Sequence, residues 1–275
     1  MQHDQVANHI VGWLKEYLQA SGQKGFVVGI SGGIDSALTS TLCAMTGAPT
    51  LCLELPIHQP PLQVSRALNH IAQLKTRFDN VNGMTVPLTE AFEALVGSWM
   101  RAEDEHVQHL ALANTRSRLR MTTLYYHAGI HHALVAGTGN KVEDFGVGFY
   151  TKYGDGGVDL SPIAGLKKTE VFALAKYLGV QEDILIAPPT DGLWQDDRSD
   201  EDQMGATYPE LEWAMDWLEL NGESVNGRWQ KPSAHVGQSL SAREWEVLAI
   251  YMRMHNNNQH KMQAIPVCEI PKGFL

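Results

Sequence analysis

The stretch Phe26–Met45, FVVGISGGIDSALTSTLCAM, constrains the fold of this chain more than any other. Its first five residues are uncharged and largely β-branched or aromatic, which is typical of a strand buried on both faces of a parallel sheet. Apolar residues then recur from Leu38 to Met45 at the spacing of one side of an amphipathic helix. Gly32 and Gly33 lie between the two patterns, where glycine lets the chain turn sharply and leaves its N–H groups uncovered. The stretch therefore predicts a strand, a glycine-rich turn and a helix in direct succession.

This turn has the properties of a phosphate-binding site. The first N–H groups of a helix have no partner within it, and the aligned peptide dipoles favour an anion at that end. Ser31 and Ser36 can add hydroxyl donors, whereas Asp35 would repel a phosphate unless a divalent cation lay between them. The turn therefore predicts a site for a magnesium-bound polyphosphate. It has neither the GxxxxGK(S/T) pattern of P-loops nor the GxGxxG pattern of dinucleotide-binding folds.

Strand-like and helix-like patterns alternate through the first half of the chain. The expected helices include residues 61–78, 89–100 and 103–129, and the expected strands are Phe26–Ile30, Thr50–Ile57, Met84–Leu88 and Ala133–Ala136. This alternation predicts an α/β fold: a doubly wound parallel sheet with helices on both faces and ligands at the carboxyl ends of the strands. No linker is long enough to divide the chain, so we expect residues 1–275 to form a single domain.

The composition argues against several classes of partner. A formal net charge of −10 is unfavourable for a nucleic-acid-binding protein that works through a broad basic surface. No apolar run approaches the ~20 residues that a membrane-spanning helix needs. The three cysteines are scattered and form no CxxC pair, so we expect no disulfide framework. These features predict a cytoplasmic protein with no nucleic-acid partner and no membrane partner.

The string SGGIDS after an apolar strand resembles the signature of the N-type ATP pyrophosphatases, which split ATP between its α and β phosphates. Other motifs narrow the resemblance to the NAD synthetases. GTGNKVED, TKYGDGGVD and SPIAGLKKTEVFALAKYLGV occur in the order and approximate spacing of that family, with NTRSRLRM upstream and APPTDGLW downstream. The match extends from Gly25 to Lys261, nearly the whole chain. The chain is most similar to the short, ammonia-dependent form, because 275 residues leave no room for the glutaminase domain of the glutamine-dependent form.

The resemblance implies a fold, a reaction and an assembly. The fold would be a Rossmann-like sheet of the adenine nucleotide alpha hydrolase type. The reaction would be the ATP-dependent amidation of deamido-NAD by ammonia, with Mg²⁺ as cofactor. The nicotinate carboxylate would attack the α-phosphorus of ATP and release pyrophosphate, and ammonia would then displace AMP to give NAD. The assembly would be a homodimer.

The resemblance also implies roles for individual residues. Asp35 and Glu143 would bind Mg²⁺, and Asp35 and Lys168 would be the catalytic residues. Lys168 would neutralise phosphate charge as pyrophosphate departs. The residues expected to contact ATP are Gly29, Ile30, Ser31, Gly32, Gly33, Ile34, Asp35, Ser36, Thr138, Lys168 and Thr190. Those expected to contact deamido-NAD are Arg118, Lys152, Asp159, His260 and Lys261. The two other arginines of NTRSRLRM, Arg116 and Arg120, are interpreted as dimer contacts or surface residues.

The sequence leaves three alternative functions open. One is another N-type ATP pyrophosphatase, such as a GMP synthetase subunit or a tRNA-thiolating enzyme. The second is a synthetase that receives ammonia from a separate glutaminase subunit. The third is a nucleotide-binding sensor without turnover, which Asp35, Glu143 and Lys168 argue against.

Overall fold

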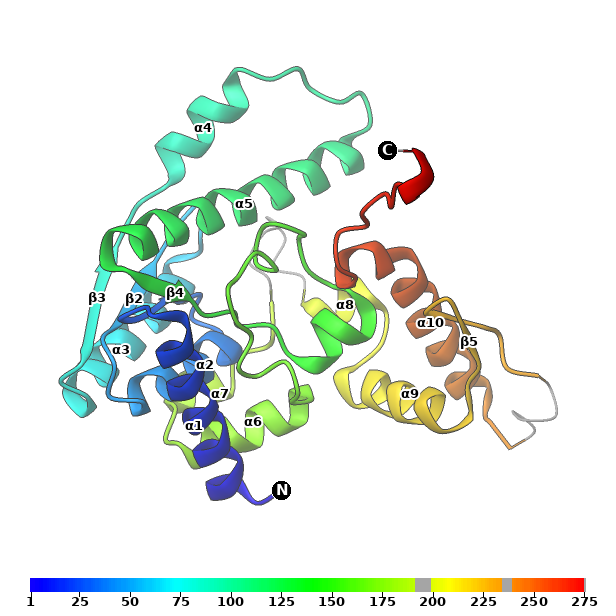
Figure 1. The fold of residues 1–275 in the computed structure, drawn as a ribbon, viewed down its shortest axis with the longest axis horizontal. Helices are drawn as coiled ribbons and strands as arrows, with labels where there is room; N and C mark the ends of the chain where they lie inside the picture. The colour runs from blue at the N-terminus through cyan, green and yellow to red at the C-terminus, as the bar shows by residue number, and fades with distance from the viewer. Residues whose placement is uncertain (191–198, 234–238, 275) are drawn as a thin grey trace.

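A computed structural model describes residues 1–190, 199–233 and 239–274 of the chain (Figure 1). Within these ranges the main sheet has four parallel strands, in the order β3-β2-β1-β4. They are β1 (Gly25–Gly29), β2 (Thr50–Glu54), β3 (Val81–Thr85) and β4 (Ala133–Val135). A parallel bridge between Ala136 and Leu160 adds a contact just beyond β4.

Helices cover both faces of this sheet. One face carries α1 (His3–Ser21), α2 (Ile34–Met45), α3 (Pro61–Arg77), α6 (Lys168–Tyr177) and α7 (Glu182–Leu185). The other face carries α4 (Thr89–Gly97) and α5 (Glu105–His131). Phe26 and Val28 belong to the first core layer and Val27 to the second, because successive strand residues point to opposite faces. The predicted parallel sheet with helices on both faces is confirmed.

Two strands differ from the prediction by more than one residue at an end. The third strand is Val81–Thr85 rather than Met84–Leu88, and it pairs residue by residue with β2 from Thr50 to Glu54. This edge strand is largely exposed, so its pattern of apolar residues does not mark it. The second strand ends at Glu54, not Ile57, and the residues that follow leave the sheet to line a cavity described below.

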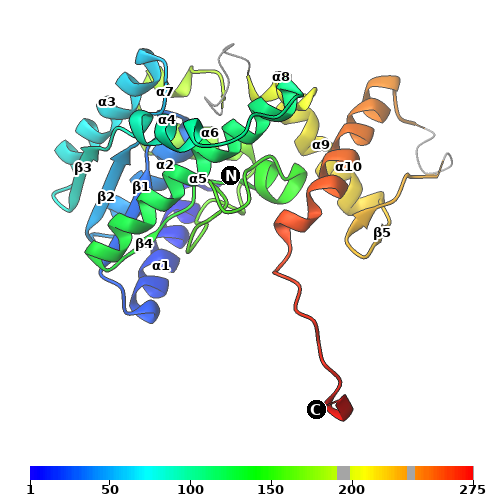
Figure 2. The same cartoon turned by 90° about the horizontal axis from the view of Figure 1, so that it is seen from above.

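A separate hydrophobic core, apart from the two layers of the sheet, lies beside the sheet on the side away from β3 (Figures 1 and 2). It is built from the π-helix η1 (Lys141–Val147), α8 (Asp200–Met204), α9 (Tyr208–Asn221) and α10 (Ala242–Met262). The remaining elements are a hairpin of β5 (Ser224–Val225) and β6 (Arg228–Trp229) and the terminal turn η2 (Lys272–Phe274). No helix in the described ranges combines the length and the apolar character needed to cross a membrane.

Candidate active site

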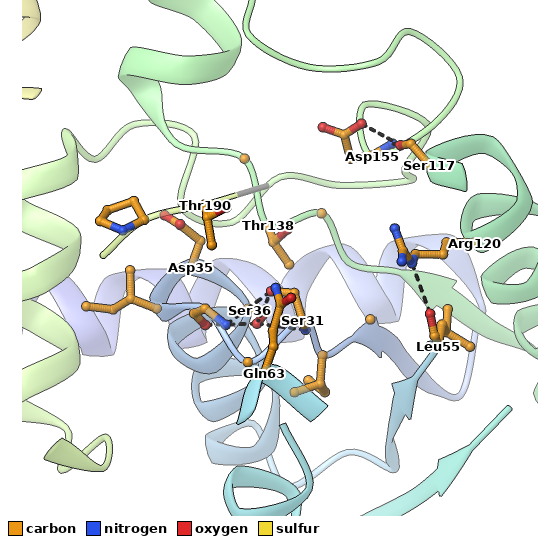
Figure 3. A pocket seen from close by; sticks show the side chains of 18 of the residues that line it. Ser31, Asp35, Ser36, Leu55, Gln63, Ser117, Arg120, Thr138, Asp155 and Thr190 are labelled. Atoms are coloured by element: carbon orange, nitrogen blue, oxygen red, sulfur yellow. Dashed lines mark hydrogen bonds between the residues drawn. The ribbon is translucent and has the colours of Figure 1, made fainter. Parts of the chain in front are cut away.

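The turn between β1 and α2 has a backbone that only glycine fits well. Gly32 has a φ of +82°, and a Cβ there would lie 2.5 Å from the carbonyl oxygen of Gln63. Ser31 and Ser36 cross-link the turn, with their Oγ atoms 3.1 Å apart (Figure 3). Ser31 Oγ also accepts a hydrogen bond from the N–H of Gly33 at 3.2 Å. The two hydroxyls therefore fix the shape of the turn, in addition to any contact they make with a ligand.

A cavity of about 260 Å³ opens over this turn, at the carboxyl ends of the strands. Its wall is formed by the turn, the residues after β2 and β4, one side of α5 and the segment 184–190. Every residue that the sequence predicted for ATP lines this cavity, and so does Glu143. Figure 3 shows Asp35 and Thr190 to one side of the serines of the turn and Arg120 to the other. The predicted ATP residues are thus brought together around one space.

Three charged side chains meet at the wall of this cavity. Lys168, the first residue of α6, places its Nζ 2.6 Å from Asp35 Oδ2 and 2.8 Å from Glu143 Oε1. Asp35 lies in the first turn of α2 and Glu143 in the first turn of η1, which follows β4. Because β1 and β4 are neighbours in the sheet, the two acids converge on one ammonium group. The Lys168 side chain is only 3% exposed.

Two further side chains hold the acids in place. Asn140, which is buried, donates from Nδ2 to Asp35 Oδ1 at 3.1 Å, and its Oδ1 accepts from the N–H of Glu143. The hydroxyl of Tyr208 donates to Glu143 Oε1 at 2.5 Å and also lies 3.3 Å from Asp200 Oδ2. The ring of Tyr208 lies beneath the Lys168 ammonium, 4.8 Å from Nζ to the ring centroid. Each carboxylate is therefore positioned by a neutral donor as well as by Lys168.

The electrostatics of the cluster follow from burial and from this pairing. Burial by itself lowers the pKa of Lys168, but the two carboxylates outweigh it and the pKa is raised. Burial and the nearby charge of Glu143 raise the pKa of Asp35 against the pull of Lys168. For Glu143, burial opposes ionisation but the donors Lys168 and Tyr208 prevail, so its pKa is lowered. The lysine is firmly charged, and its two acids are unequal partners.

The donor set suits Mg²⁺. In the described ranges no group of three or more His, Cys, Asp or Glu side chains could hold a metal ion. Mg²⁺, however, commonly takes only one or two protein carboxylates, and substrate phosphates and water complete its shell. Asp35 and Glu143 supply such a pair of hard oxygen ligands beside a turn suited to phosphate. The residues present therefore fit the ion that the sequence predicted, with the remaining ligands to come from a nucleotide.

Four of the five residues predicted for deamido-NAD lie together. Arg118 donates from Nε to the carbonyl oxygen of Lys152 at 3.3 Å, and Lys152 Nζ donates to that of His260 at 2.6 Å. Lys261 donates to the carbonyl oxygens of Gly148 and Tyr150, both at 2.8 Å. This group joins α5, the loop after η1 and the carboxyl end of α10.

Asp159 is held elsewhere. Its carboxylate accepts from the hydroxyl of Tyr125 at 3.0 Å and from the N–H of Val135 at 2.8 Å, which ties it to α5 and β4. None of the five residues predicted for deamido-NAD is among those that line the cavity over the turn. The structure thus separates them from the predicted ATP residues.

Two arginines interpreted as surface or dimer residues have other positions. Arg116 is buried, with its guanidinium 4.6 Å above the ring of Phe92. Arg120 lines the cavity and donates to the carbonyl oxygen of Leu55 at 3.0 Å and to Gln59 Oε1 at 2.7 Å. The surface interpretation is therefore wrong for Arg116, and Arg120 belongs to the site. The spacing of these two arginines could have indicated this, because residues four apart share one side of a helix and so face the same part of the protein.

Further carboxyl groups of the cavity were also missed, among them those of Asp144 and Asp155. Asp155 is open to the cavity and accepts from Ser117 Oγ at 2.7 Å and from the N–H of Thr151 at 3.0 Å. Surrounding protein raises the pKa of Asp155, and burial together with the charge of Asp155 raises that of Asp144. Asp155 is part of the TKYGDGGVD motif, but the motif alone does not say which of its aspartates faces the cavity.

Comparison with known proteins finds relatives that resemble this chain in both sequence and fold. The sequence pattern of the NAD synthase family matches residues 6–265. An NH(3)-dependent NAD(+) synthetase of Carboxydothermus hydrogenoformans is 39% identical, over 84% of this chain and 94% of that protein. The solved structure of an NMN synthetase from Francisella tularensis superposes with a TM-score of 0.80 at 32% identity, over 98% of this chain and 100% of that one. The NH3-dependent NAD synthetase of Campylobacter jejuni does so with a TM-score of 0.74 at 25% identity, over the same shares. The chain therefore belongs to the NAD synthase family.

Proposed function

We propose that this protein is an ammonia-dependent NAD synthetase, which uses ATP to amidate deamido-NAD to NAD with release of AMP and pyrophosphate. The observation that carries the proposal is the cavity in which the glycine turn meets the cluster of Asp35, Lys168 and Glu143. This combination can bind a triphosphate and neutralise its charge. The family match over residues 6–265 supports the choice of reaction.

The chemistry explains why ATP is needed. A carboxylate resists attack by an amine because oxide is a poor leaving group, and adenylation supplies a good one. The N–H groups at the start of α2 would hold the phosphates, and Lys168 would neutralise the charge that develops as pyrophosphate leaves. Mg²⁺ bound by Asp35 and Glu143 would supply further positive charge at the phosphates. The step needs positioning and charge neutralisation rather than a nucleophilic side chain.

The second step needs ammonia without its extra proton. Asp144 and Asp155 both line the cavity outside the Lys168 cluster, and both have a raised pKa. A carboxylate with a raised pKa is a better proton acceptor than one in water. One of this pair would therefore take the proton from ammonium at the wall of the cavity.

A second candidate substrate is nicotinate mononucleotide. It is favoured by the similarity to the Francisella tularensis structure, which is named as an NMN synthetase. The reacting carboxylate would be the same, so the ATP site would serve either substrate. The two candidates differ in the adenylate half, which the group of Arg118, Lys152, His260 and Lys261 would contact only in the dinucleotide.

We also infer a homodimer, as the family resemblance implies, and a cytoplasmic location. The exposed apolar side chains around the connection from α4 to α5 support a subunit contact there: Trp99, Met100, Val107 and Leu110. Sedimentation of the purified protein tests this inference. A monomer at micromolar concentration would contradict it.

The decisive experiment mixes the protein with Mg-ATP, ammonium and either deamido-NAD or nicotinate mononucleotide. We expect NAD and AMP in equal amounts from deamido-NAD, with a higher kcat/KM than for the mononucleotide. Glutamine in place of ammonium should give no product. Product only from the mononucleotide would move the protein to the second candidate, and product only with glutamine and a partner protein would contradict both.

A further inference from the structure

We propose that Lys168 is an exchangeable cation, whose ammonium group occupies the position between Asp35 and Glu143 until Mg-ATP binds and then moves to the phosphates. The proposal rests on the proposed function for the identity of the nucleotide. It adds that Lys168 makes metal binding depend on nucleotide binding. The metal site would then be closed to free Mg²⁺ and open to Mg²⁺ that arrives with a triphosphate.

The geometry supports this placement of the ammonium group. Nζ of Lys168 lies within 2.8 Å of an oxygen from each acid, so those two oxygens are no further apart than the sum of the two hydrogen-bond lengths. A metal ion held by both carboxylates would need this same space. With the Lys168 side chain only 3% exposed and the Tyr208 ring beneath it, the ammonium group fills that space.

The charges of the cluster also argue that free Mg²⁺ is excluded while Lys168 stays in place. Two carboxylates and one ammonium group leave the cluster with a net charge of −1. A divalent ion added while Lys168 stays in place would set two cations against each other in a poorly hydrated site, where their repulsion is weakly screened. A triphosphate on the turn removes this conflict, because it offers Lys168 another anion within the same cavity.

The acids have other supports when Lys168 leaves. Asn140 holds the Oδ1 atom of Asp35, while Lys168 is bonded to the Oδ2 atom. Tyr208 donates to Glu143, and the main-chain N–H of Glu143 is tied to Asn140. The carboxylates can therefore keep their positions while the cation between them is exchanged.

The test is a titration with Mn²⁺, as a paramagnetic substitute for Mg²⁺, without nucleotide or other substrate. We expect wild-type protein to bind Mn²⁺ weakly and Lys168→Met to bind it about tenfold more tightly or better, because the competing cation is gone. Mg²⁺ should likewise raise the melting temperature of Lys168→Met more than that of wild type. Adding Asp35→Asn to Lys168→Met should abolish the gain.

The matched control is Lys167→Met. Lys167 is the neighbouring residue, and its ammonium group is paired with Asp216 outside the site, at 2.6 Å from Oδ1. We expect Mn²⁺ affinity to be that of wild type in this variant. A gain in Lys167→Met equal to that in Lys168→Met would overturn the proposal, because any loss of positive charge would then explain it.

The wild-type titration decides the case if Lys168→Met does not fold. Tight Mn²⁺ binding by wild-type protein in the absence of nucleotide would overturn the proposal, and weak binding supports it. Lys168→Gln, which keeps a hydrogen-bond donor but no charge, gives a second variant with the same expected gain. None of these measurements involves NAD formation, so failure of the exchange and failure of the proposed reaction are separate results.

Discussion

Two ion clusters with the same arrangement of charges differ in their surroundings. In each, one basic side chain binds two acidic ones: Lys168 binds its two acids at the cavity, and Arg243 on α10 binds Glu210 and Glu246. The side chains of the Lys168 cluster are 3, 18 and 15% exposed, whereas those of the Arg243 cluster are 46, 30 and 62% exposed. The bond lengths are similar, so burial is the difference to explain.

Burial makes the members of the first cluster depend on one another. A buried charge that loses its partner costs far more than an exposed one, because water cannot replace the partner. Around Arg243, water and salt can take the place of either acid. Hydrogen bonds from Arg243 and Thr207 still lower the pKa of Glu210 to about 2. Because water reaches this side chain, the lowered pKa reports local contacts rather than a large contribution to stability. The comparison predicts that substitutions in the Lys168 cluster change turnover or stability strongly. Substitutions in the Arg243 cluster should change both only slightly.

The largest expected effect is the loss of turnover in Asp35→Asn. Removing one of the two carboxylates that we propose bind Mg²⁺ should lower kcat by about a thousandfold or more. Stability should also fall, because Lys168 loses one of its two buried charged partners, but the fold should remain because Lys168 keeps Glu143 and the amide retains the size of the carboxylate. AMP release and urea unfolding measure the two quantities. Turnover close to wild type would remove Asp35 from the metal site.

The next effect is on the requirement for metal in Tyr208→Phe. Without its hydroxyl, Glu143 loses a 2.5 Å hydrogen bond that orients it, and supports of this kind typically change metal affinity ten- to a hundredfold. We expect the Mg²⁺ concentration for half-maximal rate to rise by about tenfold, with a smaller change in kcat at saturating Mg²⁺.

Tyr251→Phe is the control for this variant. Tyr251 is a buried tyrosine of the same core cluster, on α10, and its ring stacks on His255. Loss of its hydroxyl should leave the Mg²⁺ requirement unchanged. Equal responses in the two variants would show that the core cluster, and not the bond to Glu143, controls the Mg²⁺ requirement.

The turn could be predicted from the sequence because its signals are local. Gly32, the serines and Asp35 lie within a few residues of one another, and backbone sterics and helix dipoles act over that range. The order of strands and helices is equally visible in the alternating patterns. The edge strand β3 was misplaced because an exposed strand has little apolar pattern to show.

Tyr208 could not be predicted in the same way. It follows Glu143 by 65 residues and reaches it only because α9 packs against η1. Its sequence context shows a helix start, with the capping residues Thr207 and Glu210, and gives no sign of a bond to a distant carboxylate. Side chains that support a site from another core cluster need the three-dimensional structure.

A third prediction concerns His70, a buried side chain that the folded protein keeps uncharged. His70 on α3 is fully buried, its Nε2 lies 2.9 Å from Ser40 Oγ, and burial and nearby Arg77 lower its pKa from 6.5 to about 4. The unfolded chain therefore binds a proton between pH 6.5 and 4 that the folded protein does not. The associated stability is present above pH 6.5 and is lost as the pH falls, by about 2 kcal/mol at pH 5.

His70→Gln isolates this contribution, because glutamine keeps an N–H donor for Ser40 and does not titrate. Urea unfolding at pH 7 and pH 5 should show a smaller loss of stability in the variant than in wild type. The exposed His9→Gln on α1 serves as the control and should lose as much as wild type. The same loss in all three proteins would show that His70 does not titrate as the structure indicates.

The smallest expected effect is that of Arg243→Gln. Both acids that lose the arginine are accessible to water, and Glu210 keeps its hydrogen bonds from the N–H and the hydroxyl of Thr207, so the start of α9 stays capped. We expect the urea midpoint and the rate of NAD formation to stay within the scatter of replicate wild-type measurements, at low and at high salt alike. A clear loss of stability that disappears in high salt would show that this exposed cluster contributes through its charges. A loss that persists in high salt would instead point to packing of the arginine stem against α9, and exposure alone would then not explain the difference between the two clusters.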